Sequence, residues 1–156
     1  MKLLKVDTIR EVEAKFRQYF SGMEKEQEEI SLRGACGRYL AEDVFADLSS
    51  PAFRRSVVDG YAVKGADTFG VSESFPVFLK VIGTVEMGKP ATMTLREGEA
   101  AYVPTGGMLP AGADAMVMVE YTELLDASTI SINRPAAPGA DMMNIGDDFH
   151  AGDQLF

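Results

Sequence analysis

Three loop segments contain the residue types whose spacing could support chemistry. The first is PAFRRSVVDGYAV, residues 51–63, in which Asp59 follows a basic turn and precedes an aromatic strand. The carboxylate of Asp59 would stand at the entrance of that strand, where it could take part in a site. An Asp-Gly pair is also common in turns, in which the aspartate accepts a hydrogen bond from its own backbone. Spacing alone favours the turn.

The second segment, VPTGGMLPAGADAMVMVE, places a hydroxyl group beside two glycines. Thr105 offers the hydroxyl, and Gly106 and Gly107 offer backbone N–H groups that no side chain covers, so that the three could close on an oxyanion. A glycine turn between two buried strands is the alternative. No Gly-Lys-Ser/Thr sequence follows, so the segment is not a Walker phosphate-binding loop.

The third segment, IGDDFHAGD, has a cluster of acidic residues. Asp147, Asp148 and Asp153 could bind a hard cation, but their spacing is not that of an EF-hand, and a solvated acidic turn is the favoured interpretation. His150 and Cys36 are the single His and the single Cys, so the sequence indicates neither a zinc site nor a histidine-based triad and excludes an internal disulfide. Cys36 lies among small residues and is expected to be a buried filler.

An amphipathic helix is expected near the start of the chain. Its apolar residues recur at three- and four-residue steps and form one stripe, at Ile9, Val12, Phe16 and Phe20. Asp7 precedes the stripe and can cap the helix. We expect the stripe to pack in the protein's own core rather than to hold a cofactor.

Short strands are expected over most of the remaining chain. Residues 28–53 predict a short strand, a compact turn around residues 34–37 and a second strand through Val44. From Gly60 onward, Gly, Pro, Asp and Asn separate five apolar runs: GYAV, PVFLKVIGTV, AAYVP, DAMVMVEYTELL and TISIN. No second helix of three or more turns is indicated.

The expected fold class is therefore mainly β, with an N-terminal amphipathic helix. The helix is followed by an irregular multi-stranded β region, a small distorted barrel, and by an elongated segment of strands and helical turns. We expect residues 1–26 to form the helix, residues 27–50 and 134–156 the elongated domain, and residues 51–133 the barrel-like domain.

Composition and charge exclude several classes of function. The sequence has 156 residues, of which 46% are hydrophobic and 25% charged, and its net charge is −9. Such a charge repels nucleic acid and anionic lipid, and no apolar run reaches the roughly 20 residues that cross a bilayer. The N-terminus lacks the apolar stretch of a secretory signal, so a cytoplasmic protein is expected. Arg54 and Arg55 could attract a small anion, although two solvated arginines are the simpler interpretation.

Taken in order, these segments resemble the molybdopterin molybdenumtransferase family, which includes bacterial MoeA and the E domain of gephyrin. The opening helix of the family matches residues 7–21, and its GRxLAEDV element matches residues 37–44. Its PxFxxSxMDGYAV element matches residues 51–63, and its TGAxVPxGADAVVxxE element matches residues 105–120. The resemblance covers nearly the whole chain.

The resemblance implies a site, substrates and a metal. Asp59 and Thr105 match active-site positions, and Asp148 matches the aspartate of the family's GED loop. Asp59 and Asp148 are then the expected metal-binding residues, and Ser56, Gly106 and Gly107 the expected ligand-binding residues. The family binds adenylylated molybdopterin, uses Mg²⁺ and molybdate and releases AMP. A carboxylate faces a phosphate favourably only across a cation, whereas Thr105 can donate directly to an oxyanion.

Two departures from the family pattern bear on this expectation. Residues 141–145 read DMMNI where the family has an arginine-rich stretch, which removes positive charge before the GED loop. Arg55 and Val58 replace the usual Asn and Met of the element before Asp59. The basic charge is then expected at Arg54 and Arg55 instead.

Family members continue into a domain that binds most of the pterin and then into a carboxy-terminal β domain. The chain ends at Phe156, so we expect a fragment that supplies half of a site formed between the subunits of a homodimer. The isolated chain is then expected to be inactive. The alternative is a non-catalytic β module for protein interaction or oxyanion sensing.

Overall fold

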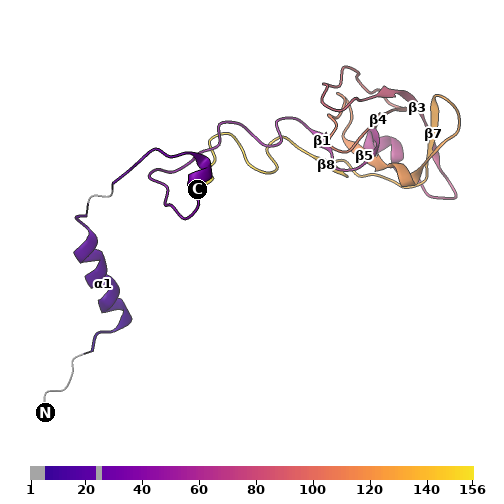
Figure 1. The fold of residues 1–156 in the computed structure, drawn as a ribbon. Helices are drawn as coiled ribbons and strands as arrows, with labels where there is room; N and C mark the ends of the chain where they lie inside the picture. Colours follow the sequence, from indigo (N-terminus) through magenta and orange to yellow (C-terminus); the bar gives the residue numbers. More distant parts are fainter. Residues whose placement is uncertain (1–5, 24–25) are drawn as a thin grey trace, which may run out of the picture. The chain divides into compact units, whose positions relative to one another are not determined.

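The computed structural model describes residues 6–23 and 26–156, and the chain divides into two compact units, residues 1–42 and 43–156 (Figure 1). In the first unit, helix α1 spans Ile9–Phe20. Thr8, not the expected Asp7, caps α1, because the Thr8 side chain accepts from the Glu11 backbone while the Glu11 carboxylate accepts from the Thr8 backbone. Asp7 instead forms an ion pair with Lys15.

The apolar stripe of α1 is confirmed as a pattern, but the first unit gives it no core to pack in. None of the residues of α1 is buried, and the rings of Phe16 and Phe20 stack on each other with their centroids 5.5 Å apart.

After α1, the prediction of a short strand near residue 30 is wrong, because residues 26–31 have no regular structure. Leu32–Gly34 form a short 3₁₀ helix, η1, which begins the expected compact turn. Cys36 is exposed, so its expected burial is also wrong.

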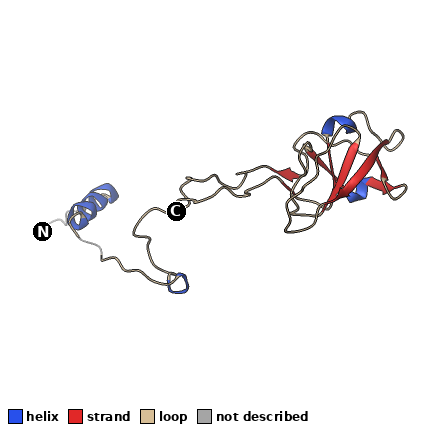
Figure 2. Ribbon diagram, turned by 90° about the horizontal axis from the view of Figure 1, so that it is seen from above, coloured by secondary structure: helices blue, strands red, loops and turns tan. Residues whose placement is uncertain are grey.

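The second unit contains a curled six-stranded sheet in the order β5-β2-β4-β3-β7-β6, which confirms the mainly β fold class (Figure 2). Its strands are β2 (Gly60–Val63), β3 (Val77–Thr84), β4 (Glu99–Val103), β5 (Ala115–Met118), β6 (Thr122–Leu124) and β7 (Thr129–Ile132). β3 and β4 run parallel, and the other neighbours are antiparallel. The run DAMVMVEYTELL gives two strands rather than one, because the 3₁₀ helix η3 (Val119–Tyr121) separates β5 from β6.

In β2, β4 and β5, side chains on both faces of the sheet are buried, which explains the apolar runs in these strands. Ala62 belongs to one buried cluster with Val103 and Met116, and its neighbour Val63 belongs to the other with Val117. Successive residues of a strand point to opposite faces, so the buried residues of β2, β4 and β5 are apolar on both faces. The 3₁₀ helix η2 (Gly65–Thr68) follows β2, and the site lies at the other end of this strand.

A two-stranded ribbon leads to the sheet. β1 (Arg55–Ser56) pairs antiparallel with β8 (Met142–Met143), and these two segments run side by side in Figure 1. Isolated bridges between Ser50 and Phe149 and between Phe45 and Gln154 continue the pairing. The expected elongated segment of strands is therefore present. The strand expected through Val44 is reduced to backbone hydrogen bonds with the last two residues of the chain, Leu155 and Phe156.

Candidate active site

Asp59 and Thr105 meet at one end of two neighbouring strands. Asp59 precedes β2 and Thr105 follows β4, and the antiparallel register pairs Gly60 with Val103. The Oδ1 atom of Asp59 accepts from the Thr105 N–H at 2.8 Å and from the Thr105 hydroxyl at 3.1 Å. The carboxylate therefore bonds a residue distant in sequence and not its own backbone. Both residues are exposed.

Gly60 fixes the backbone that carries the Asp59 carboxylate. A Cβ atom at this position would lie 2.0 Å from the carbonyl oxygen of Val117, so no other residue fits between β4 and β5 without a shift of the backbone. The Asp59 carbonyl oxygen also accepts from the Val119 N–H at 3.0 Å. The main chain of Asp59 is thus held on the β5 side while its side chain faces Thr105.

The two glycines after Thr105 form a turn whose N–H groups are already engaged. The Gly106 N–H donates to the Ser56 carbonyl oxygen and the Gly107 N–H donates to the Pro104 carbonyl oxygen, both at 2.8 Å. Gly106 has a φ of 81°, and a Cβ at Gly107 would lie 2.8 Å from the Pro104 oxygen. These glycines therefore shape the turn, and an anion bound there would compete with existing hydrogen bonds.

Ser56 is buried beneath the same turn. Its side chain is 1% exposed, donates to the Val58 carbonyl oxygen at 2.5 Å and accepts from the Val58 N–H at 3.1 Å. Its backbone binds both glycines of the turn, since the Ser56 N–H donates to the Gly107 oxygen at 3.0 Å. In this conformation Ser56 holds the loop in place, and its hydroxyl does not face solvent.

Asp148 lies on the ribbon, apart from the Asp59–Thr105 pair. Its Oδ2 atom accepts from the Ser50 hydroxyl at 3.0 Å, and its N–H donates to the Ser50 carbonyl oxygen at 2.9 Å. Ser50 precedes β1, which begins at Arg55, so Asp148 lies farther along the ribbon than that strand. Among the hydrogen bonds of the described residues, none joins Asp148 to Asp59 or Thr105.

The other two aspartates of the acidic segment close turns. The Asp147 carboxylate accepts from the Asn144 N–H at 2.6 Å, and the Asp153 carboxylate accepts from the His150 N–H at 2.7 Å. Within residues 6–23 and 26–156, no group of three or more His, Cys, Asp or Glu residues is arranged to hold a metal ion. The carboxylates of Asp147 and Asp153 therefore close local turns.

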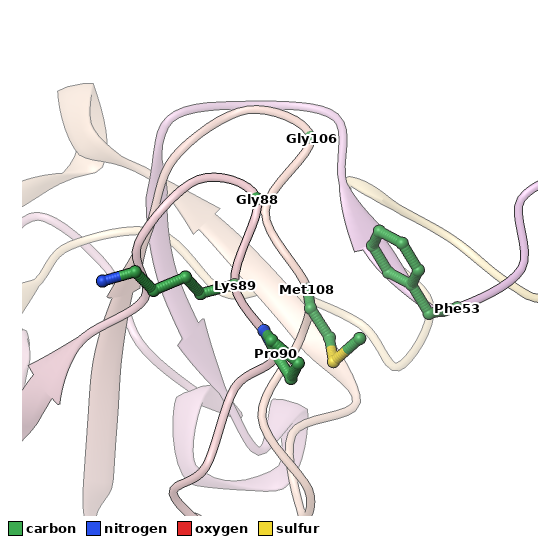
Figure 3. Close-up of a pocket in the computed structure, with 6 residues that line it drawn as sticks. All are labelled: Phe53, Gly88, Lys89, Pro90, Gly106 and Met108. Atoms are coloured by element: carbon green, nitrogen blue, oxygen red, sulfur yellow. The ribbon is translucent and has the colours of Figure 1, made fainter.

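A small pocket opens beside the Thr105–Gly107 turn. It measures about 170 Å³ and is lined by Phe53, Gly88, Lys89, Pro90, Gly106 and Met108 (Figure 3). The Phe53 ring and the Met108 thioether face each other on one side, whereas the Lys89 side chain points away from them. Sequence reasoning missed this pocket because its lining comes from three separate loops. It also missed Ser50, whose partner Asp148 is 98 positions away.

Comparisons with known proteins match this fold and the order of its motifs. The sequence model of the family described as "MoeA N-terminal region (domain I and II)" matches residues 4–156. The chain belongs to this family. It is 36% identical over 133 residues to a molybdopterin molybdenumtransferase of Bacillus subtilis, an alignment that covers 83% of this chain and 31% of that protein. It is 37% identical over 123 residues to molybdopterin molybdenumtransferase 2 of Mycobacterium tuberculosis, covering 79% and 30%.

Solved structures of MoeA proteins have the same fold. The crystal structure of the molybdopterin biosynthesis MoeA protein from Pyrococcus horikoshii OT3 superposes with a TM-score of 0.78 at 38% identity, covering 83% of this chain and 34% of that one. The chain thus spans about a third of the length of the relatives it matches. The comparisons confirm the resemblance to the MoeA family. In the described part of the chain, no helix has the length and apolarity needed to cross a membrane.

Proposed function

We propose that this chain contributes to the insertion of molybdate into adenylylated molybdopterin with release of AMP. The observation that carries the proposal is the double hydrogen bond from Thr105 to one oxygen of Asp59. This bond orients the carboxylate and leaves Oδ2, which accepts no hydrogen bond from any described residue. Asp59 is exposed, so that oxygen can reach a ligand outside the chain.

The donor set at Asp59 fits Mg²⁺. This ion binds through one or two carboxylates and keeps water and substrate phosphate oxygens as its remaining ligands, so a full cage of protein ligands is not needed. Mg²⁺ bound by Asp59 would neutralise charge on the phosphoanhydride of the substrate. Asp148 lies farther along the ribbon than Asp59, beside Ser50. On this proposal it binds a cation only at a different part of the substrate from the part that Asp59 binds.

Asp59 and Thr105 lie on an open surface, and the proposed reaction requires a closed site. Exclusion of water strengthens the electrostatic interactions that stabilise a phosphoryl transition state. We therefore infer that another surface covers Asp59 and Thr105 during the reaction, and that a homodimer supplies it. On this proposal residues 1–156 alone bind ligand weakly and do not catalyse the reaction.

Calorimetric titration of the chain with adenylylated molybdopterin and Mg²⁺ tests the proposal. We expect binding that is weakened about tenfold or more by Asp59→Ala, which removes a charge-assisted interaction. Asp126→Ala is the matched control, because the Asp126 carboxylate is also exposed but accepts hydrogen bonds only from its own turn. Equal binding by the parent and Asp59→Ala would overturn the proposed role of Asp59.

One observation favours a second candidate, a non-catalytic module. Residues 141–145 carry an aspartate and no basic residue, and the N–H groups of Gly106 and Gly107 are already bonded within the protein. A site with fewer free anion donors suits protein interaction better than substrate binding. Absence of any calorimetric signal with the pterin substrate would favour this candidate.

A further inference from the structure

Arg55 lies on the outward face of the ribbon where it joins the sheet. Arg55 is directly opposite Met143 on one side and Met108 on the other, and directly opposite residues of neighbouring strands point to the same face. The adjacent pair, Ser56 and Met142, occupies the inner face, because Ser56 is buried and Met142 packs against the buried cluster around Val103. The side chains of Arg55, Met108 and Met143 therefore face away from the core.

The pocket beside Gly106 opens on this same face. Met108 lines it, and so does Phe53, which precedes Arg55 by two residues in the chain. Figure 3 shows the Phe53 ring next to the Met108 thioether. Phe53 is 37% exposed, so one side of its ring remains available to a ligand. The wall is thus an aromatic ring and a polarizable sulfur, a surface suited to a flat ring.

The guanidinium of Arg55 has no carboxylate partner. Its one side-chain hydrogen bond runs from Nη2 to the Met143 sulfur at 3.3 Å, and none of the ion pairs among the described residues includes Arg55. The chain has 24 acidic and 15 basic residues, so acidic partners are plentiful. Lys89, also at the pocket, pairs with Glu86 instead, at 2.5 Å. Arg55 therefore presents unused donors, and guanidinium groups bind phosphate in two-pronged fashion.

We propose that Phe53, Met108 and Arg55 form a subsite for a flat nitrogen heterocycle that carries a phosphate group. The ring contacts Phe53 and Met108, and Arg55 binds the phosphate. The pocket of about 170 Å³ is smaller than the 300–1,000 Å³ typical of a complete ligand site, so it holds one part of a larger ligand. This proposal rests on the proposed function, because adenylylated molybdopterin offers this chemistry twice, in its adenylate and in its pterin phosphate.

Amide chemical shifts of the ¹⁵N-labelled chain at low ionic strength test the subsite. The probes are AMP, neopterin monophosphate, adenosine and ribose phosphate. We expect the amide signals of Gly88, Gly106 and Met108 to shift with AMP or with neopterin monophosphate. The probe with the higher affinity shows whether the subsite binds the adenylate or the pterin phosphate of the substrate. Adenosine and ribose phosphate, each of which lacks one of the two groups, should bind at least about tenfold more weakly.

Three variants assign the binding to individual side chains. Arg55→Gln should weaken binding of the tighter probe about tenfold, Arg55→Lys should weaken it less, and Phe53→Ala should abolish the preference for probes with a ring. Lys80→Gln is the matched control and should leave the affinity unchanged, because Lys80 is exposed on β3 and does not line the pocket. The subsite is refuted by shifts confined to other surfaces, or by equal affinities of the Arg55→Gln variant and the parent.

Asp59→Ala separates this inference from the proposed function. The variant keeps the pocket, so AMP or neopterin monophosphate should still bind to it with unchanged affinity. If the Arg55 variants bind the probes normally while Asp59→Ala still weakens binding of the full substrate with Mg²⁺, the subsite is wrong and the proposed function stands. If the Arg55 variants lose the probes and Asp59→Ala leaves full-substrate binding intact, the subsite stands and the role of Asp59 is wrong.

Discussion

The Asp59 carboxylate accepts two hydrogen bonds from Thr105, at 2.8 Å from the N–H and at 3.1 Å from the hydroxyl, both on the same oxygen. The backbone donor survives any substitution except proline, whereas the hydroxyl donor depends on the side chain. The two residues are 46 positions apart in sequence, so the bond also ties the loop after β4 to the start of β2.

Thr105→Val keeps the shape of the side chain and removes the hydroxyl. We expect the variant to bind adenylylated molybdopterin with Mg²⁺ about tenfold more weakly, because Asp59 loses one of the two donors that orient it. The melting temperature should hardly change, since Thr105 is exposed. Calorimetric titration measures the affinity. Thr105→Ser retains the hydroxyl and should bind like the parent; a Thr105→Ser variant as weak as Thr105→Val would show that the hydroxyl is not responsible.

Gly60→Ala should destabilise the second unit by about 3 kcal/mol, because overpacking against a backbone atom cannot be relieved by a rotamer change. The added Cβ would lie 2.0 Å from the Val117 oxygen. Gly83→Ala in β3 is the control: its Cβ would meet the flexible end of Met93 at 3.2 Å, and the change should stay within about 1 kcal/mol. Urea denaturation gives both values. Similar losses for the two variants would contradict the close approach of β2 and β5.

The central strands were predicted well because β2, β4 and β5 are buried on both faces. Ala62 and Val63 pack in different clusters, so β2 reads as an apolar run, and the same holds for β5 and for the part of β4 after Glu99. A run of this kind does not show where a strand ends, and the break at η3 inside DAMVMVEYTELL was missed for that reason. The sequence does contain the signal for the helix cap, because Glu11 follows Thr8 by three residues, the spacing of a capping box. The prediction of Asp7 as the cap overlooked this spacing.

The site was less readable because its contacts join distant residues. Spacing alone favoured a turn at Asp59, and only the resemblance to a family placed Asp59 and Thr105 in one site. The structure brings these two side chains together and places Asp148 beside Ser50. The catalytic and metal-binding roles of all three stay predictions. The sequence offers no local signal for the hydrogen bond between Ser50 and Asp148, since the partners become neighbours only when the ribbon pairs.

Helix α1 should lose stability in acid. Hydrogen bonds from the Thr8 backbone and then from its side chain lower the pKa of Glu11 below its usual 4.5. A lowered pKa in the folded state means that the stabilisation is complete above the unfolded-state value of 4.5 and is lost as the pH falls through the lowered value. Circular dichroism should therefore show helix content falling below pH 4.5. Glu11→Gln, which cannot ionise, should remove this part of the pH dependence, and an unchanged acid transition in that variant would contradict it.

Thr68 connects η2 to the chain after β7 through a hydroxyl that is fully buried. Its single proton has two acceptors in reach, the Gly65 oxygen at 2.8 Å and the Ala136 oxygen at 3.1 Å, and its oxygen accepts from the Ala136 N–H at 2.9 Å. Thr68→Val leaves the Ala136 N–H unpaired where water cannot replace the bond, which costs about 1–3 kcal/mol.

Urea denaturation of Thr68→Val should show this loss without a change in the denaturant dependence, since the surface exposed on unfolding is the same. Thr122→Val is the control, because the Thr122 hydroxyl makes a single bond, to the Val119 oxygen at 2.9 Å, and is partly exposed. Its loss should stay within about 0.5 kcal/mol. Equal losses for the two variants would mean that the Ala136 N–H finds another partner when Thr68 is replaced, and that η2 does not depend on this hydroxyl for its place beside the sheet.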